Sequence, residues 1–210
     1  MVPVTTNEIL SMRVSLLLLT GLLLTACSMP RGPTRSRVFL PAMRLEDSGG
    51  LSGVARITPD LYRGAQPTEA GYTRLNDMGV KTVISFRRFN DSRAEVAAAG
   101  LEFVRIPIYA SIGSNPPTDE QLQAFFDTVL DPAKQPVFMH CKHGKDRTGM
   151  MAALFRIERQ CWTNQEAVDE MQAFGYHDVF RDLIGFVRDY EARFFEPPPA
   201  KPGAQASHSR

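Results

Sequence analysis

The sequence predicts an α/β fold: a three-layer sandwich in which helices cover both faces of a central, mostly parallel sheet. Between residues 51 and 195, short strand-like runs rich in Val, Ile and Phe alternate with helix-like segments, and a series of helices follows. Parallel strands need crossover connections, which helices usually provide. A chain of 210 residues that is 43% hydrophobic is long enough for one such domain with extensions.

Strands and helices are assigned in chain order. The expected strands are residues 54–57, 61–62, 81–86, 101–108 and 136–140. Helices are expected to begin at Thr68, Thr118 and Thr163, and the last two threonines are followed three residues later by Gln121 and Glu166, the pattern of a capping box. Further helices are expected between residues 86 and 100, after residue 149, and over residues 179–194.

The overall charge does not favour nucleic acid as a partner. The chain has 24 Lys and Arg against 23 Asp and Glu, for a formal net charge of +1. This balance gives no reason to expect binding to nucleic acid. Attraction for anions must therefore come from a local cluster of cations.

The amino-terminal residues have the pattern of an export signal. Residues 14–26 form an apolar run with Arg13 directly before it. The run is shorter than the roughly 20 residues that span a bilayer as a helix, but it has the length of a signal-peptide core. Translation is expected to start at Met1 or Met12.

The end of this run resembles a bacterial lipobox. The sequence LTAC at residues 24–27 predicts that Cys27 is lipidated and becomes the mature amino terminus, and Ser28 favours sorting to the outer membrane. The predicted location is the bacterial cell envelope, lipid-anchored and facing the periplasm. An ordinary secretory signal with an incidental cysteine is the alternative.

Four segments are therefore expected along the chain. They are a lipoprotein signal peptide at 1–27, a flexible tether at 28–50, the globular domain at 51–195 and a disordered tail at 196–210. The tether is rich in Arg, Pro, Ser and Gly without clear periodicity, and the tail is rich in Pro.

A ten-residue stretch, HCKHGKDRTG at residues 140–149, concentrates reactive groups between an expected strand and an expected helix. Ligands bind at this place in open α/β sheets, and the unpaired N–H groups of a helix start favour an anion. A thiol such as Cys141 in this positive field has a lowered pKa. Arg147 offers a planar fork for two phosphoryl oxygens. The stretch predicts a phosphate-sized pocket with a nucleophile at its floor.

A zinc site, a nucleotide-binding loop and a disulfide all fit the stretch less well. Zinc would need ligands from His140, Cys141, His143 and the distant His177, and adjacent residues at a strand end chelate poorly. A nucleotide-binding P-loop requires lysine directly before Ser or Thr, which is absent here. A disulfide between Cys141 and Cys161 would have to bridge a helix about 20 Å long.

The stretch is similar to the signature His-Cys-x-x-Gly-x-x-Arg-Ser/Thr-Gly of the cysteine-dependent tyrosine and dual-specificity phosphatases. The resemblance extends to LYRGAQP at 61–67, the KTVISFRR strand and WTNQEAVDEM, and covers residues 50–195. It is typical of the compact bacterial and plant–fungal branch of that family. It implies a tyrosine phosphatase-like fold with the phosphate-binding loop between a strand and a helix.

The resemblance also implies roles for the motif residues. Cys141 attacks phosphorus to form a phosphocysteine, Thr148 assists departure of the thiolate, and His140 tunes it. The phosphate-binding residues are Lys142, His143, Gly144, Lys145, Asp146 and Arg147. Neither a metal nor an organic cofactor is required.

The match to the family signature does not identify a general acid. The family supplies an aspartate from a loop about 30 residues before the cysteine, but residues 109–117 contain no acid. Asp119 is one candidate, with compensation of the helix dipole as its alternative role. Asp146 is the other candidate and is slightly favoured, with orientation of Arg147 as its alternative role. A substrate with a good leaving group needs no acid at all.

The predicted substrates are proteins carrying phosphotyrosine, with phosphoserine and phosphothreonine as further targets. Inositol polyphosphates or phosphoinositides are the alternative, because Lys142 and Lys145 flank the pocket and extra cations suit several phosphates. Four more side chains are expected near the pocket: Arg63, Gln66, Arg87 and Arg88. A pseudophosphatase that binds phospho-ligands without turnover and a rhodanese-like sulfur transferase are less favoured.

Overall fold

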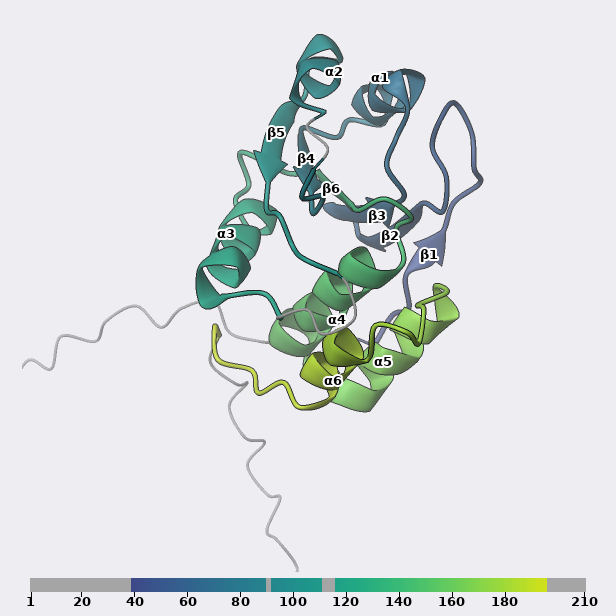
Figure 1. Ribbon diagram of the computed structural model, residues 1–210. Helices are drawn as coiled ribbons and strands as arrows, with labels where there is room; N and C mark the ends of the chain where they lie inside the picture. The colour runs from purple at the N-terminus through teal and green to yellow at the C-terminus, as the bar shows by residue number, and fades with distance from the viewer. Residues whose placement is uncertain (1–38, 90–91, 111–115, 196–210) are drawn as a thin grey trace, which may run out of the picture. The chain divides into compact units, whose positions relative to one another are not determined.

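The computed structural model describes residues 39–89, 92–110 and 116–195, all within one compact unit (Figure 1). Its strands are β1 (Met43–Arg44), β2 (Ala55–Thr58), β3 (Leu61–Gly64), β4 (Thr82–Ser85), β5 (Glu102–Arg105) and β6 (Val137–His140). Its helices are α1 (Glu69–Asp77), α2 (Arg93–Ala98), α3 (Asp119–Val129), α4 (Asp146–Gln160), α5 (Asn164–Ala173) and α6 (Arg181–Arg188).

The six strands form one sheet in the order β1-β2-β3-β6-β4-β5. The pairs β3–β6, β6–β4 and β4–β5 are parallel, whereas β1–β2 and β2–β3 are antiparallel. The sheet is therefore mixed and mostly parallel, as predicted. Register places Gly64 and Ser85 on either side of His140, so three parallel strands end at one edge of the sheet. This edge carries the loop that follows β6.

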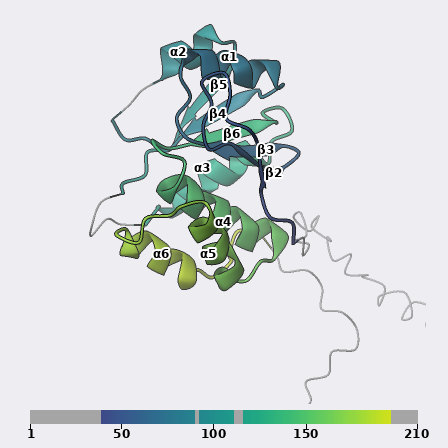
Figure 2. The ribbon, with the colours of Figure 1, turned by 90° about the vertical axis from the view of Figure 1, so that its right-hand side faces the viewer.

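Helices cover both faces of the sheet and give the predicted three layers. Side chains alternate along β6: Phe138 packs in one cluster with residues of α1 and α2, while Val137 and Met139 pack in the other cluster with residues of α3 to α6. Figure 2 shows α1 and α2 on one side of the strands and α4, α5 and α6 on the other. Alternation of this kind is expected for a strand buried on both faces.

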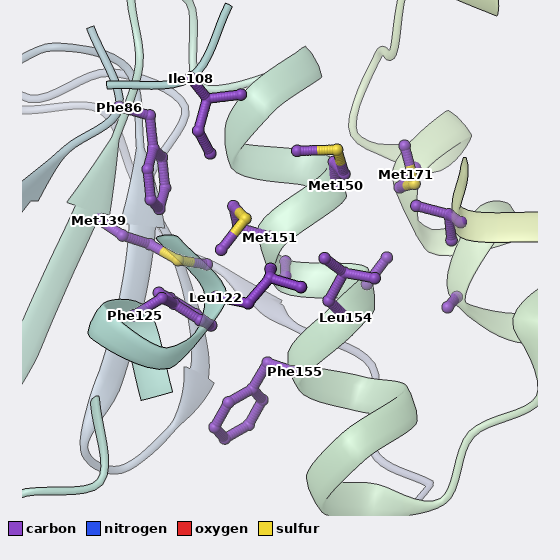
Figure 3. Close-up of a cluster of buried hydrophobic side chains, with 14 of the residues drawn as sticks. Phe86, Ile108, Leu122, Phe125, Met139, Met150, Met151, Leu154, Phe155 and Met171 are labelled. Atoms are coloured by element: carbon purple, nitrogen blue, oxygen red, sulfur yellow. The ribbon is translucent and has the colours of Figure 1, made fainter. Parts of the chain in front are cut away.

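The larger cluster holds α4 against the sheet. Phe86, Met139 and Ile108 meet Met150, Met151 and Leu154 of α4, and Leu122 and Phe125 of α3 close the side (Figure 3). Nearly every residue of α4 is buried, including Arg156, Glu158 and Gln160. The helix that starts at the reactive motif is thus the central helix of the domain.

The predicted helix starts are confirmed at their capping residues. Thr118 accepts a hydrogen bond from the Gln121 N–H, and the Gln121 side chain accepts one from the Thr118 N–H. Thr163 and Glu166 form the same reciprocal pair at the start of α5. These contacts satisfy N–H groups that have no partner within the helix.

Two segments differ from the sequence prediction. The helix expected over 179–194 is shorter, because α6 ends at Arg188 and the chain then turns to Glu158, which accepts hydrogen bonds from the Tyr190 hydroxyl and the Arg193 N–H. The tether expected over 28–50 contains β1, and the Ala42 N–H donates to Glu170 at 2.8 Å. Residues 39–50 therefore include part of the folded domain.

The predicted signal peptide, Cys27 and the tail at 196–210 lie outside the described residues. Within the residues that the structure does describe, no helix is both long enough and apolar enough to cross a membrane.

Candidate active site

The reactive motif forms the loop that joins β6 to α4. Cys141 directly follows β6, residues 142–145 form the loop, and α4 begins at Asp146. Neighbouring strand ends hold it on two sides, since the Gln66 N–H donates to the Lys142 carbonyl and the Phe86 N–H donates to the His140 carbonyl. The loop thus lies at the sheet edge where the sequence predicts an anion site.

Gly144 allows the loop to touch the end of β3. Its φ of +70° is in the left-handed region, which side chains other than glycine rarely adopt. A Cβ atom at this position would lie 2.4 Å from the Gly64 carbonyl carbon and 2.5 Å from the Ala65 nitrogen. Both the backbone conformation and the close approach therefore require glycine here.

The Cys141 thiol is buried, and its pKa is below the ordinary value. Burial alone would raise the pKa, but the Thr148 hydroxyl, the Thr148 and His143 N–H groups and the positive charge of Arg147 outweigh it. Apart from the thiol, the buried Oγ1 atom of Thr148 has no hydrogen-bond partner in the described part of the chain, so its hydroxyl is available to the thiolate. The surroundings favour the reactive form of the cysteine.

Arg147 lies in the first turn of α4 and is half-buried. Its Nη1 atom donates to the Phe86 carbonyl, beyond the end of β4, at 3.3 Å. This bond ties the side chain to the end of β4. A guanidinium has five N–H donors, so one bond to the protein leaves a fork for two oxygens of an anion.

His140 is fully buried and contacts the backbone of the cysteine. Its Nδ1 atom lies 3.1 Å from the Cys141 carbonyl oxygen, and burial lowers the pKa of the imidazole to about 4. The ring stacks near Phe138 and meets Tyr72 edge to face. At neutral pH it is an uncharged group that holds the start of the loop.

The three remaining cationic or basic loop residues differ in position. Lys142 and His143 are exposed. Lys145 is half-buried and lies against the turn after α5, where a Cβ on Gly175 would be 3.3 Å from its Cε and 3.5 Å from its Nζ. Of the two lysines expected to flank the pocket, Lys145 is thus packed along a neighbouring segment.

The Asp146 carboxylate, buried at the start of α4, is bound to His177. The His177 backbone N–H donates to Oδ1 at 2.9 Å, and the Nδ1 atom lies 2.9 Å from Oδ1 and 3.1 Å from Oδ2. The His177 side chain is 46% exposed. No motif or spacing in the sequence links these residues, which are 31 positions apart. The general-acid role of Asp146 stays a prediction.

Asp119, the other candidate acid, begins α3. Its side chain is 71% exposed and forms an ion pair with Arg193, which follows α6. This pair ties the first turn of α3 to the carboxyl-terminal part of the domain. The catalytic role of Asp119 also stays a prediction.

The four side chains that topology predicts near the pocket have different surroundings. Gln66 accepts a hydrogen bond from Arg87 and donates one to Ser92 at 3.1 Å. Arg88 stacks with the rings of Phe89 and Tyr109 at 5.0 and 4.8 Å. Arg63 is fully buried behind the loop and donates from Nη2 to the Gly144 carbonyl at 2.8 Å.

The structure also bears on the alternatives for the cysteines. Cys141 and Cys161 are not joined by a disulfide, and Cys161 ends α4 with a φ of 55°. Among residues 39–89, 92–110 and 116–195, no group of three His, Cys, Asp or Glu side chains is arranged to hold a metal ion.

Comparison with known families agrees with the loop geometry. Residues 45–181 match a family described as "DSP-PTPase phosphatase fused to NAD+ Kinase". The chain belongs to this dual-specificity phosphatase family. The matched range contains β2 to β6, the loop and α4.

Proteins from bacteria and plants are similar to the chain. The dual specificity protein phosphatase TpbA of Pseudomonas aeruginosa strain UCBPP-PA14 is 35% identical over 76% of this chain and 68% of its own length. A crystal structure of P. aeruginosa TpbA with its cysteine changed to serine, in complex with phosphotyrosine, has a TM-score of 0.61 at 33% identity and covers 74% and 93% of the two chains. The inositol diphosphatase DSP4 of Arabidopsis thaliana is 28% identical over 57% of this chain and 62% of its own length.

The requirement for glycine in the loop leads to a first prediction. Gly144→Ala is expected to lower the free energy of unfolding by at least about 2 kcal/mol more than Gly79→Ala does, because it adds a backbone clash to the cost of a positive φ. Gly79 is the matched control, since its φ is +82° and a Cβ there meets nothing within 4 Å. Denaturant titration measures both, and equal losses would show that the loop has room for a side chain.

Proposed function

We propose that the protein hydrolyses phosphomonoesters through a phosphocysteine intermediate and that its substrates are proteins carrying phosphotyrosine, with phosphoserine and phosphothreonine as further targets. The observation that carries the proposal is the Cys141 thiol, which is buried beneath backbone N–H groups and beside Arg147, with its pKa lowered. Family membership supports phosphatase activity in general. The choice of substrate and mechanism rests on the geometry of the loop.

In the first step, the Cys141 sulfur attacks phosphorus and forms an S–P bond while the P–O bond to the leaving group breaks. Negative charge on the phosphoryl oxygens is met by the loop N–H groups and the free N–H groups of Arg147. Because Arg147 is already held by the Phe86 carbonyl, little reorganisation is needed when the anion binds.

In the second step, water attacks phosphorus, the P–S bond breaks, and inorganic phosphate leaves. The electron pair returns to sulfur, so groups that stabilise the thiolate now lower the barrier. Thr148 is suited to this role because its buried hydroxyl lowers the pKa of the thiol and has no other partner among the described residues.

Two features favour phosphotyrosine. TpbA, the relative described above, has been crystallised with phosphotyrosine. In addition, Phe89 is 85% exposed, and the Arg88 guanidinium lies 5.0 Å from the Phe89 ring and 4.8 Å from the Tyr109 ring. Arg88 is close in the chain to Phe86, whose carbonyl binds Arg147. An aromatic and cationic rim of this kind suits a flat, negatively charged side chain.

Inositol polyphosphates are the second candidate. Lys142 and His143 are exposed on the loop, and an Arabidopsis relative is an inositol diphosphatase. Lys145, however, is packed against Gly175, which leaves fewer cations for additional phosphates. Protein phosphotyrosine is therefore the preferred substrate class.

For the leaving oxygen, we propose Asp146 as the proton donor. It directly precedes Arg147, and its carboxylate is hydrogen-bonded to His177, a half-exposed imidazole that can return a proton from solvent after each turnover. Asp119 is the competing donor, engaged by Arg193.

The nucleophile prediction is tested with Cys141→Ser. Wild-type protein is expected to release phosphate from para-nitrophenyl phosphate and phosphotyrosine peptides, with a higher kcat/KM on the peptides than on phosphoserine peptides or inositol polyphosphates. Cys141→Ser should reduce turnover by at least about 1,000-fold, because a hydroxyl has no comparable anionic form at neutral pH. Cys161→Ser is the matched control, since that thiol lies at the far end of α4.

Different outcomes separate the alternatives. Turnover that survives Cys141→Ser would contradict the phosphocysteine mechanism. Binding of phosphotyrosine peptides without turnover by the wild type would indicate a pseudophosphatase, and a higher kcat/KM on inositol polyphosphates would reverse the substrate preference.

The donor prediction compares leaving groups. Asp146→Asn should lower kcat/KM for phenyl phosphate at least tenfold more than for para-nitrophenyl phosphate, because only the poorer leaving group depends on protonation. His177→Ala removes the imidazole but keeps the carboxylate, so kcat/KM should not show this difference between the two leaving groups. The same leaving-group dependence in Asp119→Asn, and its absence in Asp146→Asn, would assign the donor to Asp119.

For location, we propose a lipid anchor at Cys27 in the bacterial cell envelope. The motif at residues 24–27 supports it. In a bacterium expressing the full chain, Cys27→Ala should move the protein from the membrane fraction to the soluble fraction, whereas Cys161→Ala should not. If Cys27→Ala stays with the membranes, the anchor is not at this cysteine.

A further inference from the structure

The back of the phosphate-binding loop is held by the segment that joins β3 to α1. Arg63 donates from Nη2 to the Gly144 carbonyl at 2.8 Å, and the Gln66 N–H donates to the Lys142 carbonyl at 3.3 Å. The two bonds alternate along the loop, because the carbonyl between them, that of His143, is skipped. Both come from residues that topology alone predicts near the pocket.

Holding a carbonyl outward also directs an N–H inward. In a trans peptide, the C=O of one residue and the N–H of the next point in opposite directions. The bond to the Lys142 carbonyl therefore orients the His143 N–H, which is among the groups that lower the pKa of the Cys141 thiol. By the same geometry, the bond from Arg63 to the Gly144 carbonyl orients the Lys145 N–H toward the pocket.

Arg63 is also a buried charge without a carboxylate of its own. Its side chain is fully buried, and the Nε and Nη1 atoms have no hydrogen-bond partner in the described part of the chain. Among the described acids, Glu170 has the largest effect on the Arg63 charge, but it is already bound by Arg156 at 2.8 and 3.1 Å. A buried cation with unused donors is costly unless an anion balances it.

The charges around Arg63 indicate which anion that is. Burial lowers the pKa of its guanidinium to about 10, Glu170 and Cys141 oppose this effect, and Arg156 and Arg44 add to it. The group thus stays charged at neutral pH. Since Glu170 is shared with Arg156, the Cys141 thiolate and an anion bound above it are the remaining partners.

We propose that Arg63 is a positioning residue that fixes the N–H groups of the phosphate-binding loop from behind and supplies a second, buried positive charge to the thiolate and the bound phosphoryl group. The proposal rests on the proposed function in that the ligand of the loop is a phosphoryl group. It adds to Arg147 a cation that does not touch the substrate.

A purely structural role of Arg63 and a role in the site predict different effects of its replacement on stability. If Arg63 served only the fold, its replacement by an apolar side chain would destabilise the domain and leave the chemistry of folded molecules unchanged. If Arg63 instead serves the site, its replacement should leave the stability of the domain unchanged or higher and should alter the chemistry of the site. Replacing an uncompensated buried charge by an apolar group of similar size is often neutral or stabilising.

The experiment uses Arg63→Met, Arg63→Lys and, as matched control, Arg44→Met. Arg44 and Arg63 both stack on the Phe174 ring, at 4.1 and 4.3 Å, but Arg44 donates to the Ala173 carbonyl and not to the loop. Three quantities are measured: the midpoint of thermal unfolding, the pH dependence of Cys141 alkylation by iodoacetamide, and the dissociation constant for tungstate, a tetrahedral oxyanion.

Arg63→Met should unfold at or above the wild-type midpoint, shift the alkylation profile to higher pH and bind tungstate at least about tenfold more weakly, as expected for a lost charged hydrogen bond. The groups that face the thiol directly, Arg147, Thr148 and His143, are unchanged in all variants. Arg63→Lys keeps a charge but not the forked guanidinium. Its alkylation profile and its tungstate affinity should therefore fall between those of the wild type and of Arg63→Met. Arg44→Met should have the alkylation profile and the tungstate affinity of the wild type.

A wild-type alkylation profile and wild-type tungstate affinity in folded Arg63→Met would overturn the proposal. If Arg63→Met does not fold, wild-type values of both quantities in Arg63→Lys would overturn it instead. Neither measurement requires turnover. A wild-type protein that hydrolyses no phosphomonoester but responds to Arg63→Met as expected would contradict the proposed function and leave this inference standing.

Discussion

The close approach of two backbones, at Gly144 and at Gly64–Ala65, is the constraint on which the geometry of the candidate site depends. The loop after β6 can curl only if it lies directly on the end of β3, where Arg63 and Gln66 bind its outward carbonyls. With the back of the loop fixed there, the His143 N–H faces the thiol. The parallel register of β3, β6 and β4 is what brings the three strand ends together for this contact.

Local chemistry makes much of the fold predictable from the sequence. Thr118 with Gln121 and Thr163 with Glu166 mark helix starts because each pair satisfies its own N–H groups within one turn. The loop itself is predictable for a similar reason, since Cys141 and Arg147 belong to one short motif between a strand and a helix. The three-layer arrangement follows from the alternation of strands and helices.

Contacts between distant segments are not predictable in the same way. His177 binds Asp146 across 31 residues, and no periodicity or spacing indicates the pair. Topology predicts Arg63 near the pocket, but its buried position behind the loop contradicts the usual preference of arginine for the surface. The predicted end of α6 is wrong, although the sequence stays amphipathic beyond it. The Tyr190 hydroxyl and the Arg193 N–H instead donate to buried Glu158 on another helix, and the chain leaves the helical path.

The attachment of residues 39–44 determines where a pulling force on the amino-terminal side of the chain would act on the domain. Ala42 and Arg44 are bonded to Glu170 and to the Ala173 carbonyl of α5, and Glu170 is clamped by Arg156 on α4. Tension applied to the chain on the amino-terminal side would therefore enter the domain through α5 and the later turns of α4, and also through the antiparallel edge of the sheet, because β1 pairs with β2. Arg156 lies well beyond the first turn of α4, where Arg147 sits. These points of entry are separate from the first turn of α4.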